Sequence, residues 1–443
     1  MNRRDFLSKS AKYTLATTAG LSLWGAKPRW AGAADRVRVG VVGIRGMGFG
    51  HIRSFSELEN VEVTALCDVD ERLFPERLQW LENNGHPTPD TYVDIRKMLD
   101  DRNIDAIGVA TPNHWHSLAG FWAAQAGVHS TLEKPATHNI FEGQQLIKAA
   151  DRYNVLIQQH AERRSFPGFQ SAAEFLRNGG LGEVYLAKGL CYKWRDTIGH
   201  TPVEPVPEGV HYDLWLGPAP RRPFTRNRFH YEWHWHWEYG NGDIGNQGVH
   251  QMDIARWLLG VDFPTKISSM GGHFMFNDDK ETPNTQMALF EFSNPDGGGD
   301  KKKMMQFEVR HWITHHEGGV EGPGDFTIGN LFYGSEGYMS ISLNGDWQTY
   351  MGRDREPGPS GSGRGNMFQN FVDAIRANDR SMLDGDIVEG HKSCALMHMA
   401  NTSYRLGRTL NFDPATERYI DDDEANAMMT RDYREPFVIP GNF

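Results

Sequence analysis

The chain has 443 residues, of which 39% are hydrophobic and 23% are charged, and its formal net charge is −11. This composition is ordinary for a globular protein, and the length predicts roughly two domains. The acidity argues against nucleic-acid and anionic-membrane partners, while three widely spaced cysteines, Cys67, Cys191 and Cys394, predict small buried side chains and neither a disulfide framework nor a metal site.

Residues 1–33 have the pattern of a twin-arginine export signal. Arg3 and Arg4 lie in a short basic segment, a mildly apolar stretch follows at residues 13–24, and a small-residue cleavage site stands at 31–33. We therefore expect a periplasmic or otherwise exported protein. The signal holds six Lys or Arg and one Asp, so removing its net charge of +5 leaves −16 on the mature chain. No later apolar run reaches the ~20 residues that a spanning helix needs, so no integral membrane span is expected there.

From residue 34 to residue 160, apolar runs of strand length alternate with amphipathic segments. This alternation is typical of a doubly wound parallel sheet with crossover helices. Strands are predicted at residues 37–42, 61–67, 91–93, 106–110, 129–133 and 155–159, and helices at 48–59, 71–83, 95–100, 116–126 and 140–153. Six such strands make a complete nucleotide-binding Rossmann domain.

A glycine-rich segment follows the first predicted strand, with Gly43, Gly46 and Gly48 around Arg45. Amide groups at a helix start can bind a pyrophosphate, so these four residues are predicted cofactor contacts. Arg45 replaces the second glycine of the usual G-x-G-x-x-G pattern, and its side chain either hinders close approach or reaches a phosphate itself. Asp68 ends the second strand, where a carboxylate binds ribose hydroxyls and repels a 2′-phosphate; this favours NAD, with NADP as the alternative.

Two more segments end parallel strands, at the edge where such sheets bind ligands. One runs from residue 110 to residue 116, and the other is Glu133-Lys134-Pro135. The cofactor contacts predicted in them are Thr111, Pro112, Asn113, His116, Glu133 and Lys134.

From residue 161 to residue 443 the pattern changes to longer β-like segments, which predicts an extended sheet with a few helices. Strands are predicted at residues 184–192, 266–273, 286–292, 304–312, 327–333 and 338–342, turn-rich pieces at 296–299 and 356–365, and helices at 366–377 and 389–406.

Several of these segments together resemble the Gfo/Idh/MocA family, named for glucose-fructose oxidoreductase and inositol dehydrogenase, in a twin-arginine-exported subgroup. The residues that carry the resemblance are Glu133-Lys134-Pro135, the segment GNGDIGNQGVHQMD at 240–253, and the segments at 332–337 and 370–375. It covers essentially the whole mature chain. The fold that it implies is α/β, with an N-terminal Rossmann sheet and a C-terminal α+β domain built on a large open, mostly antiparallel sheet that carries the substrate pocket.

The resemblance also implies catalytic roles. Lys134 would lie by the nicotinamide and the substrate hydroxyl, where an ammonium stabilises a developing alkoxide. His250 matches the histidine that removes or returns the hydroxyl proton, and Asp253, three residues on, is expected on the same helical face as a substrate contact. Asn246 departs from the family, since many members carry an aspartate there. An asparagine can orient a neighbour but cannot hold a proton, and Asp243 is the candidate substitute.

Aromatic residues crowd the segment 231–239, where a period of two predicts one face with His234 and His236 and another with tryptophans and tyrosines. A carbohydrate-binding wall and plain packing are both consistent with this pattern. Trp235 and His236 are the predicted substrate contacts. A metal site is disfavoured, because no third ligand has defined spacing.

Together these features predict an exported NAD(P)-dependent oxidoreductase that moves a hydride between a sugar, polyol or glycoside and a tightly bound nicotinamide cofactor. The alternatives are a redox-neutral, NAD-dependent glycosidase and a catalytically silent sugar-binding relative. The resemblance further implies a homo-oligomer, a dimer or a tetramer.

Overall fold

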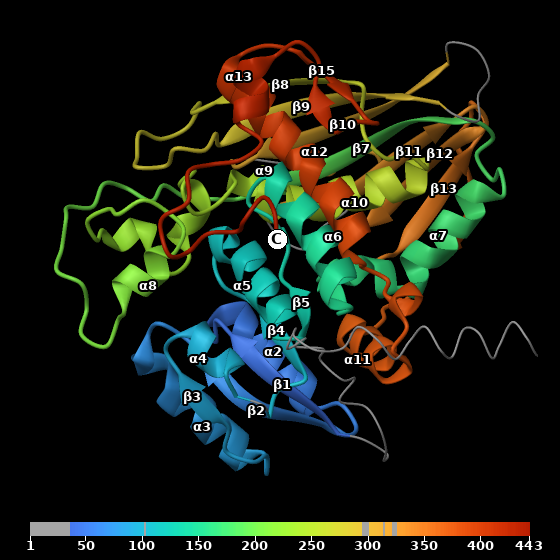
Figure 1. Ribbon diagram of the computed structural model, residues 1–443. Coiled ribbons are helices and arrows are strands. Elements are labelled where there is room, and N and C mark those ends of the chain that lie inside the picture. The colour runs from blue at the N-terminus through green and yellow to red at the C-terminus, as the bar shows by residue number, and fades with distance from the viewer. Residues whose placement is uncertain (1–35, 102, 295–300, 313–314, 321–325) are drawn as a thin grey trace, which may run out of the picture. The chain divides into compact units, whose positions relative to one another are not determined.

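The computed structural model describes residues 36–443 except residues 102, 295–300, 313–314 and 321–325. The predicted export signal, residues 1–33, lies outside the described residues. Strands up to residue 159 form one sheet and later strands form a second, larger one (Figure 1). Within the described ranges, no helix has the length and hydrophobicity needed to cross a bilayer.

The first sheet confirms the predicted doubly wound fold. Its six strands are parallel and lie in the order β3-β2-β1-β4-β5-β6. The strands are β1 (Val37–Val42), β2 (Val61–Cys67), β3 (Asp90–Tyr92), β4 (Ala106–Val109), β5 (His129–Leu132) and β6 (Ile157–Gln159). The helices are α2 (Gly46–Ser56), α3 (Phe74–Asn83), α4 (Ile95–Leu99), α5 (Asn113–Gln125) and α6 (Ile140–Tyr153).

Two helices of the first domain begin earlier than predicted, and both shifts bring helix amides to the edge of the sheet. Helix α2 starts at Gly46 instead of residue 48, and α5 starts at Asn113 instead of residue 116. Pro112 precedes α5 with φ −61° and ψ 154°, an extended conformation that its ring favours and that ends the connection from β4. Asn113 and the amides after it therefore face the region that a ligand would occupy.

The second sheet has ten strands in the order β14-β13-β12-β11-β7-β10-β9-β8-β15-β16, and it is antiparallel except for the β7–β10 pair. Its strands are β7 (Val184–Lys193), β8 (Lys266–Gly272), β9 (Thr285–Ser293), β10 (Lys302–Arg310), β11 (Phe326–Gly334), β12 (Gly337–Ser342), β13 (Trp347–Met351), β14 (Glu356–Gly361), β15 (Leu410–Asp413) and β16 (Arg418–Tyr419). The turn-rich piece predicted at 356–365 is thus wrong in part. Its prolines are accommodated because β14 is an edge strand.

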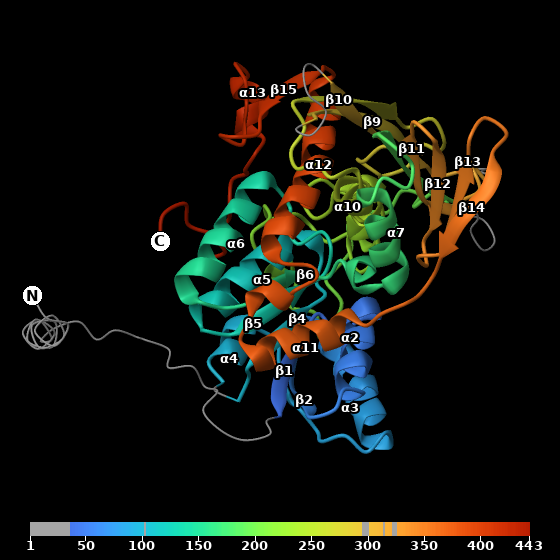
Figure 2. The same cartoon turned by 90° about the vertical axis from the view of Figure 1, so that its right-hand side faces the viewer.

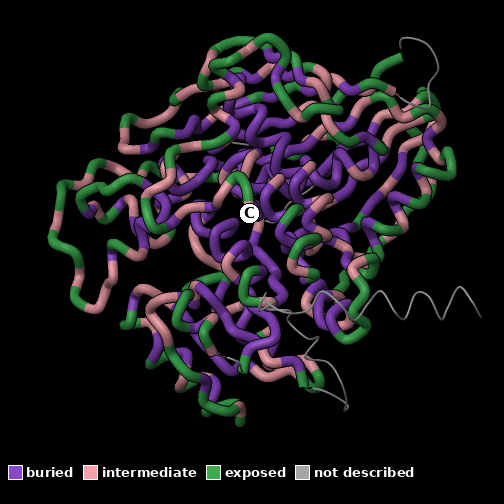
Figure 3. The backbone as a smooth tube through the Cα atoms, in the orientation of Figure 1, coloured by how far each residue is buried: buried purple, intermediate pink, exposed green. Residues whose placement is uncertain are grey.

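Helices cover one face of this sheet, as Figures 1 and 2 show, and Figure 3 colours the layer between them as buried. They are α7 (Pro167–Arg177), α10 (Gly248–Leu259) and α12 (Ile387–Leu406). The other helices of this part of the chain are α8 (Tyr212–Leu216), α9 (Gly242–Asn246), α11 (Met367–Ala377) and α13 (Asp423–Ala427), of which α11 lies beside α2 in Figure 2. Exposure alternates along β9, with Met287 and Leu289 exposed and their neighbours buried, so the opposite face of the sheet is open. The three cysteines are buried and free, which confirms their prediction as small core residues.

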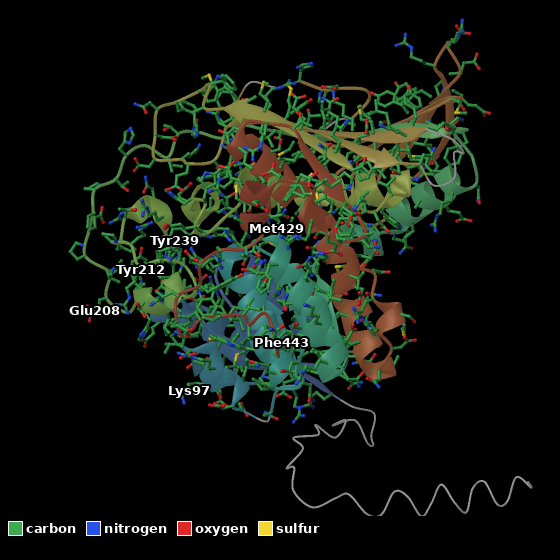
Figure 4. All side chains as sticks on the ribbon, turned by 45° about the horizontal axis from the view of Figure 1, so that its top comes forward. Lys97, Glu208, Tyr212, Tyr239, Met429 and Phe443 are labelled. Carbon is green, nitrogen blue, oxygen red and sulfur yellow. The ribbon has the colours of Figure 1, made fainter. Side chains whose placement is uncertain are left out.

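Two irregular segments bring the second half of the chain back to the first sheet. The residues from 195 to 240, here called the arm, hold an aromatic cluster that includes Tyr212 and Tyr239, both labelled in Figure 4. The tail after α13 runs along α5, where Phe437 packs in the same core cluster as Trp115. Arm and tail thereby fix the nucleotide-binding domain against later parts of the chain.

Candidate active site

The glycine turn packs tightly against the end of β4. Gly43 has a φ of +78°, and a Cβ built on it would lie 2.7 Å from the carbonyl oxygen of Ala110. A Cβ on Gly48 would lie 1.6 Å from the carbonyl oxygen of Gly43, so only glycine allows α2 to fold back on the strand end. Gly48 is therefore a packing residue and does not line the adjoining cavity. Gly43, Arg45 and Gly46 do line it, and open space surrounds the position of a Cβ on Gly46.

Asp68, which follows β2, stabilises the same turn by hydrogen bonds. Its carboxylate accepts hydrogen bonds from the backbone N–H of Ile44 at 2.8 Å and from that of Asp70 at 2.9 Å. Burial raises the pKa of Asp68 to about 6, because these bonds only partly offset the loss of hydration. Asp68 lines the cavity, as its predicted role as a ribose contact requires.

The residues predicted at the two later strand ends also come together. Thr111, Pro112, Asn113, His116, Glu133 and Lys134 all line the cavity. The hydroxyl of Thr111 and the side-chain oxygen of Asn113 are buried and have no hydrogen-bond partner among the described residues. The His116 ring lies 2.7 Å from the carbonyl oxygens of both Thr111 and Pro135, which ties the two strand ends together. Unpartnered polar atoms at this edge of a parallel sheet fit a bound nucleotide.

Glu133 lines the cavity and supports the backbone of Lys134. Its carboxylate accepts the backbone N–H of Lys134 at 3.1 Å and lies 3.1 Å from His51 Nε2. Burial alone would raise the pKa of Glu133, but the His51 hydrogen bond and the neighbouring charges of His160, His51 and Lys134 hold it well below its usual value. The carboxylate is therefore anionic and fixes the backbone from which Lys134 projects.

A chain of hydrogen bonds connects Lys134 to a buried carboxylate. Lys134 Nζ donates to the backbone oxygen of Asn246 at 2.8 Å and to Asn246 Oδ1 at 3.2 Å, and Asn246 Nδ2 donates to Asp243 Oδ1 at 2.9 Å. Asp243 also accepts from Arg195 Nε at 3.0 Å and lies 2.8 Å from His311 Nε2. The carboxylate that the family places at position 246 thus stands three residues earlier and reaches Lys134 through a carboxamide.

The predicted proton acceptor, His250, lies in the first turn of α10, whereas Asn246 is the last residue of α9. It is 9% exposed and is not among the residues that line the cavity. Burial, followed by the charges of Arg163, Lys134 and Lys193, holds the pKa of His250 well below its usual value of 6.5. The imidazole is therefore neutral, which is the form that can take up a proton.

Asp253 does not reach the cavity, which corrects its prediction as a substrate contact. Its carboxylate accepts hydrogen bonds from Arg164 Nε at 2.9 Å and Nη2 at 2.8 Å, and from the hydroxyl of Ser393 at 2.5 Å. Both charged side chains are buried. Asp253 and Arg164 therefore form a buried ion pair, and the Ser393 hydrogen bond links α10 to α12.

The aromatic segment also differs from its prediction. Residues 232–235 form a 3-10 helix, so the expected alternation of two faces is wrong. Trp235 Nε1 donates to Glu232 Oε2 at 2.6 Å, three residues away, which a helical turn allows and a strand does not. His236 is buried with Nε2 2.9 Å from the Asn227 carbonyl oxygen. Neither Trp235 nor His236 lines the cavity, and no group of three metal-ligating side chains occurs among the described residues.

Residues of the arm make the outer wall of the cavity, whose volume is about 520 Å³. The arm residues that line it are Leu214, Trp215, Phe229, His230, Tyr231, Trp233 and His234. The first four were not predicted, whereas the last three lie in the segment 231–239, for which a carbohydrate-binding wall was one of the two alternatives. The carbonyl oxygen of Trp215 anchors the arm, since Trp115 Nε1 donates to it at 2.9 Å and His114 Nε2 lies 3.0 Å away. The density of aromatic residues between positions 212 and 239 was the available signal.

His234 is a second neutral imidazole at this wall. Its Nδ1 lies 2.6 Å from the carbonyl oxygen of Tyr231, so Nδ1 carries the hydrogen and Nε2 keeps a lone pair. Burial lowers the pKa of His234 to about 3. Two strand-end cations that the sequence reasoning did not use, Lys193 and Arg195, also line the cavity.

Two family comparisons match the chain. Residues 37–160 match the oxidoreductase family, NAD-binding Rossmann fold, and residues 181–270 and 362–439 match the oxidoreductase family, C-terminal alpha/beta domain. Among named relatives, a glycosyl hydrolase family 109 protein of Shewanella pealeana is 30% identical over 170 residues. That alignment covers 34% of this chain and 37% of the relative, so it spans well under half of either protein.

Solved structures share the fold over most of the chain. The WlbA dehydrogenase from Bordetella pertussis, solved with NADH and UDP-GlcNAcA, is 20% identical with a TM-score of 0.61, covering 85% of this chain and 99% of that one. An aldose-aldose oxidoreductase from Caulobacter crescentus, complexed with glycerol, is 18% identical with a TM-score of 0.62, covering 85% of this chain and 100% of that one. At these identities the likeness concerns the fold.

Proposed function

Since the chain belongs to the Gfo/Idh/MocA family of NAD-binding oxidoreductases, we propose that it transfers a hydride between NAD and a hydroxyl-bearing carbon of a sugar, polyol or glycoside. One observation carries the proposal. One cavity is lined by the glycine turn, by Asp68 and by the half-buried Lys134. It therefore combines a nucleotide cradle with a cation suited to a reacting hydroxyl.

The chain offers a complete set of groups to hold the cofactor. Amides after Gly43 would bind the pyrophosphate, Asp68 the ribose, and the unpartnered polar atoms of Thr111 and Asn113 the remaining polar groups. NAD supplies the acceptor for the hydride when it is bound. Because the arm walls the cavity and is anchored through Trp215, we propose that the cofactor is held tightly and leaves slowly.

Lys134 orients the substrate hydroxyl and stabilises negative charge on its oxygen. Burial lowers the pKa of Lys134, while Glu133 opposes that effect. The two oxygens of Asn246 fix the ammonium at 2.8 and 3.2 Å. An ammonium with two bonds of this kind has one N–H left to donate to a ligand.

The proton of that hydroxyl must pass to a neutral base. We propose His250 for this role, although it does not line the cavity, because burial and the charges of the surrounding cations keep its imidazole unprotonated. His234, with its free Nε2 at the cavity wall, is the competing base. Replacing each by asparagine separates them, because loss of a general base costs roughly 10²–10⁴-fold in rate.

The test uses the protein as purified, with its bound nucleotide, and a panel of sugars, polyols and glycosides. We expect one class of compound to change the nicotinamide absorbance at the rate of product formation. Lys134→Ala should keep the nucleotide and lose turnover. Full turnover in nucleotide-loaded Lys134→Ala would refute the assigned role, and ligand binding without any absorbance change would instead favour the catalytically silent sugar-binding protein.

A redox-neutral glycosidase is the second candidate, and the name of the 30% identical relatives favours it. In such a reaction a ring carbon is oxidised, the aglycone is eliminated, water adds and the ring is reduced again, so NAD is regenerated in each cycle. Release of p-nitrophenol from nitrophenyl glycosides without net NADH would establish it. Accumulation of NADH with an intact glycosidic bond would support the dehydrogenase.

Location and assembly belong to the same proposal. We propose that residues 1–33 direct export by the twin-arginine route and that the mature chain is a homo-oligomer. Exposed Met270, Met287, Leu289 and Met304 on the open face of the second sheet support a partner there. The mass of the protein purified from periplasm, and its molar mass by light scattering, test the two statements.

A further inference from the structure

Two ammonium groups line the cavity without an anionic partner. Lys134 bonds the two oxygens of Asn246, and Lys193 Nζ donates to Gln247 Oε1 at 2.7 Å. Asn246 and Gln247 are consecutive, so both lysines are held at one short segment of the cavity wall. Among the described residues, no carboxylate forms a salt bridge with either nitrogen. Neutral oxygens orient these cations but do not neutralise them.

Two buried carboxylates near the lysines, Asp243 and Glu133, already have hydrogen-bond partners. Asp243 is bonded by Arg195, His311 and Asn246, which uses both of its oxygens. Glu133 is occupied by His51 and by the backbone of Lys134. Glu133 lines the cavity, but its two bonds fix it in place, and neither carboxylate forms a salt bridge with a lysine of the cavity.

A third cation adds to the positive potential. Arg163 is 5% exposed, its Nη1 has no hydrogen-bond partner among the described residues, and its carboxylate neighbour Glu162 is 3.7 Å away. Together with Lys134 and Lys193, Arg163 lowers the pKa of His250. A neutral sugar would leave Lys134 and Lys193 without an anionic partner in the cavity, whereas a carboxylate would form a charge-assisted hydrogen bond with one of them.

We propose that the substrate is an acidic sugar, a uronic or aldonic acid or a glycoside of a uronic acid, and that Lys193 binds its carboxylate. The inference rests on the proposed function, because it names the class of sugar that the same cavity takes. Lys134 remains with the reacting hydroxyl. The position of Lys193 is set by Gln247, whose Nε2 in turn donates to Gln251 Oε1 at 3.0 Å.

The test compares methyl uronides of gluco, galacto and manno configuration with their C6 amides and with the parent methyl glycosides. The amide keeps the shape of the carboxylate and removes its charge. Because hydrogen bonds to charged groups are about twice as strong as neutral ones, we expect KM for the best uronide to be at least ~10-fold lower than for its amide. The readouts are reduction of the bound cofactor and, separately, binding by calorimetry.

Three variants assign the preference to its residue. Lys193→Gln should abolish the ~10-fold difference in KM between the uronide and its amide, and Lys193→Arg should retain most of it. Lys303→Gln is the matched control, because Lys303 Nζ donates to the carbonyl oxygen of Leu259 and does not line the cavity.

The outcomes separate this inference from the proposed function. Turnover of neutral sugars with KM equal to that of the uronides would overturn the acidic-sugar inference and leave the oxidoreductase intact. Absence of cofactor reduction by every compound would instead overturn the proposed function. Calorimetry would then decide the inference, which stands if a uronide binds tighter than its amide in a Lys193-dependent way and fails if the two bind equally.

Discussion

Replacing Asp243 by asparagine removes one negative charge from the centre of the site and keeps the shape of the side chain. Arg195 loses the partner of two hydrogen bonds, of 3.0 and 3.2 Å. The new amide must also turn its NH₂ group toward a donor, either Arg195 or the NH₂ of Asn246. If Asn246 turns over in response, it presents its own NH₂ to Lys134 and no longer holds the ammonium by its side chain.

The magnitude follows from these contacts. Two hydrogen bonds to a charged partner are each worth about 1.5–3 kcal/mol, and Arg195 can recover part of this from water, so we expect a loss of ~2–4 kcal/mol in unfolding free energy at pH 7. Burial alone would raise the pKa of Asp243, but chiefly the charge of Arg195 holds it well below 3.8. The stabilisation is therefore present above pH 3.8 and is lost as the pH falls through the lower folded-state pKa.

Urea unfolding and single-turnover reduction of the bound cofactor measure the two effects. Misplacement of Lys134 should slow reduction roughly 10²-fold. The matched control is Asp105→Asn, whose carboxylate binds Arg38 Nε at 2.8 Å and Nη2 at 2.7 Å at the opposite end of β4. That variant should lose stability and keep its rate. If Asp243→Asn unfolds at the wild-type urea midpoint and reduces its cofactor at the wild-type rate, the hydrogen-bond chain has no role.

Three further predictions follow from single positions. NAD should bind more tightly above pH 6 than below it, because the pKa of Asp68 is about 6 and its anionic form is the better ribose acceptor; calorimetry at pH 5 and pH 7.5 checks this, and Asp68→Asn should remove the dependence. Gly46→Ala should fold normally and bind NAD weakly, whereas Gly48→Ala should fail to fold, since its Cβ would meet a carbonyl oxygen at 1.6 Å; circular dichroism and nucleotide content distinguish them. Phe437→Ala should lower the unfolding free energy by about 3–5 kcal/mol, because the ring is 3% exposed in the first core, and an unchanged urea midpoint would contradict that packing.

Helices and strands whose ends are marked by capping or turn residues could be predicted from the sequence. Helix α6 was predicted at residues 140–153 and spans Ile140–Tyr153, since the Asn139 side chain caps its start and Asn154 ends it in a left-handed conformation. The parallel arrangement of the six strands in the first sheet likewise follows from the alternation of strands and helices. The cofactor side of the cavity could be predicted because it is made of consecutive strand ends.

The substrate side of the cavity could not be predicted from the sequence, because contacts between residues far apart in the chain determine which side chains reach it. Asp253 is paired with Arg164, 89 residues away, and no local pattern distinguishes that ion pair from a ligand contact. The 3-10 helix that turns Trp235 inward depends on the arm packing against α5, which periodicity does not encode. Lys193 was not predicted as a site residue, because in the sequence it is only the last residue of a strand.

The tail that lies along α5 gives the protein a particular order of assembly during synthesis. Arg431 Nη2 donates to the carbonyl oxygen of His114 across 317 residues, and Tyr433 donates to Glu142 across 291. At ribosomal rates of about 5–20 residues per second, His114 emerges roughly 15–60 s before its partner. The nucleotide-binding domain is therefore synthesised well before the tail that covers the apolar surface around Trp115. We expect chaperones to bind this surface until the tail has been made.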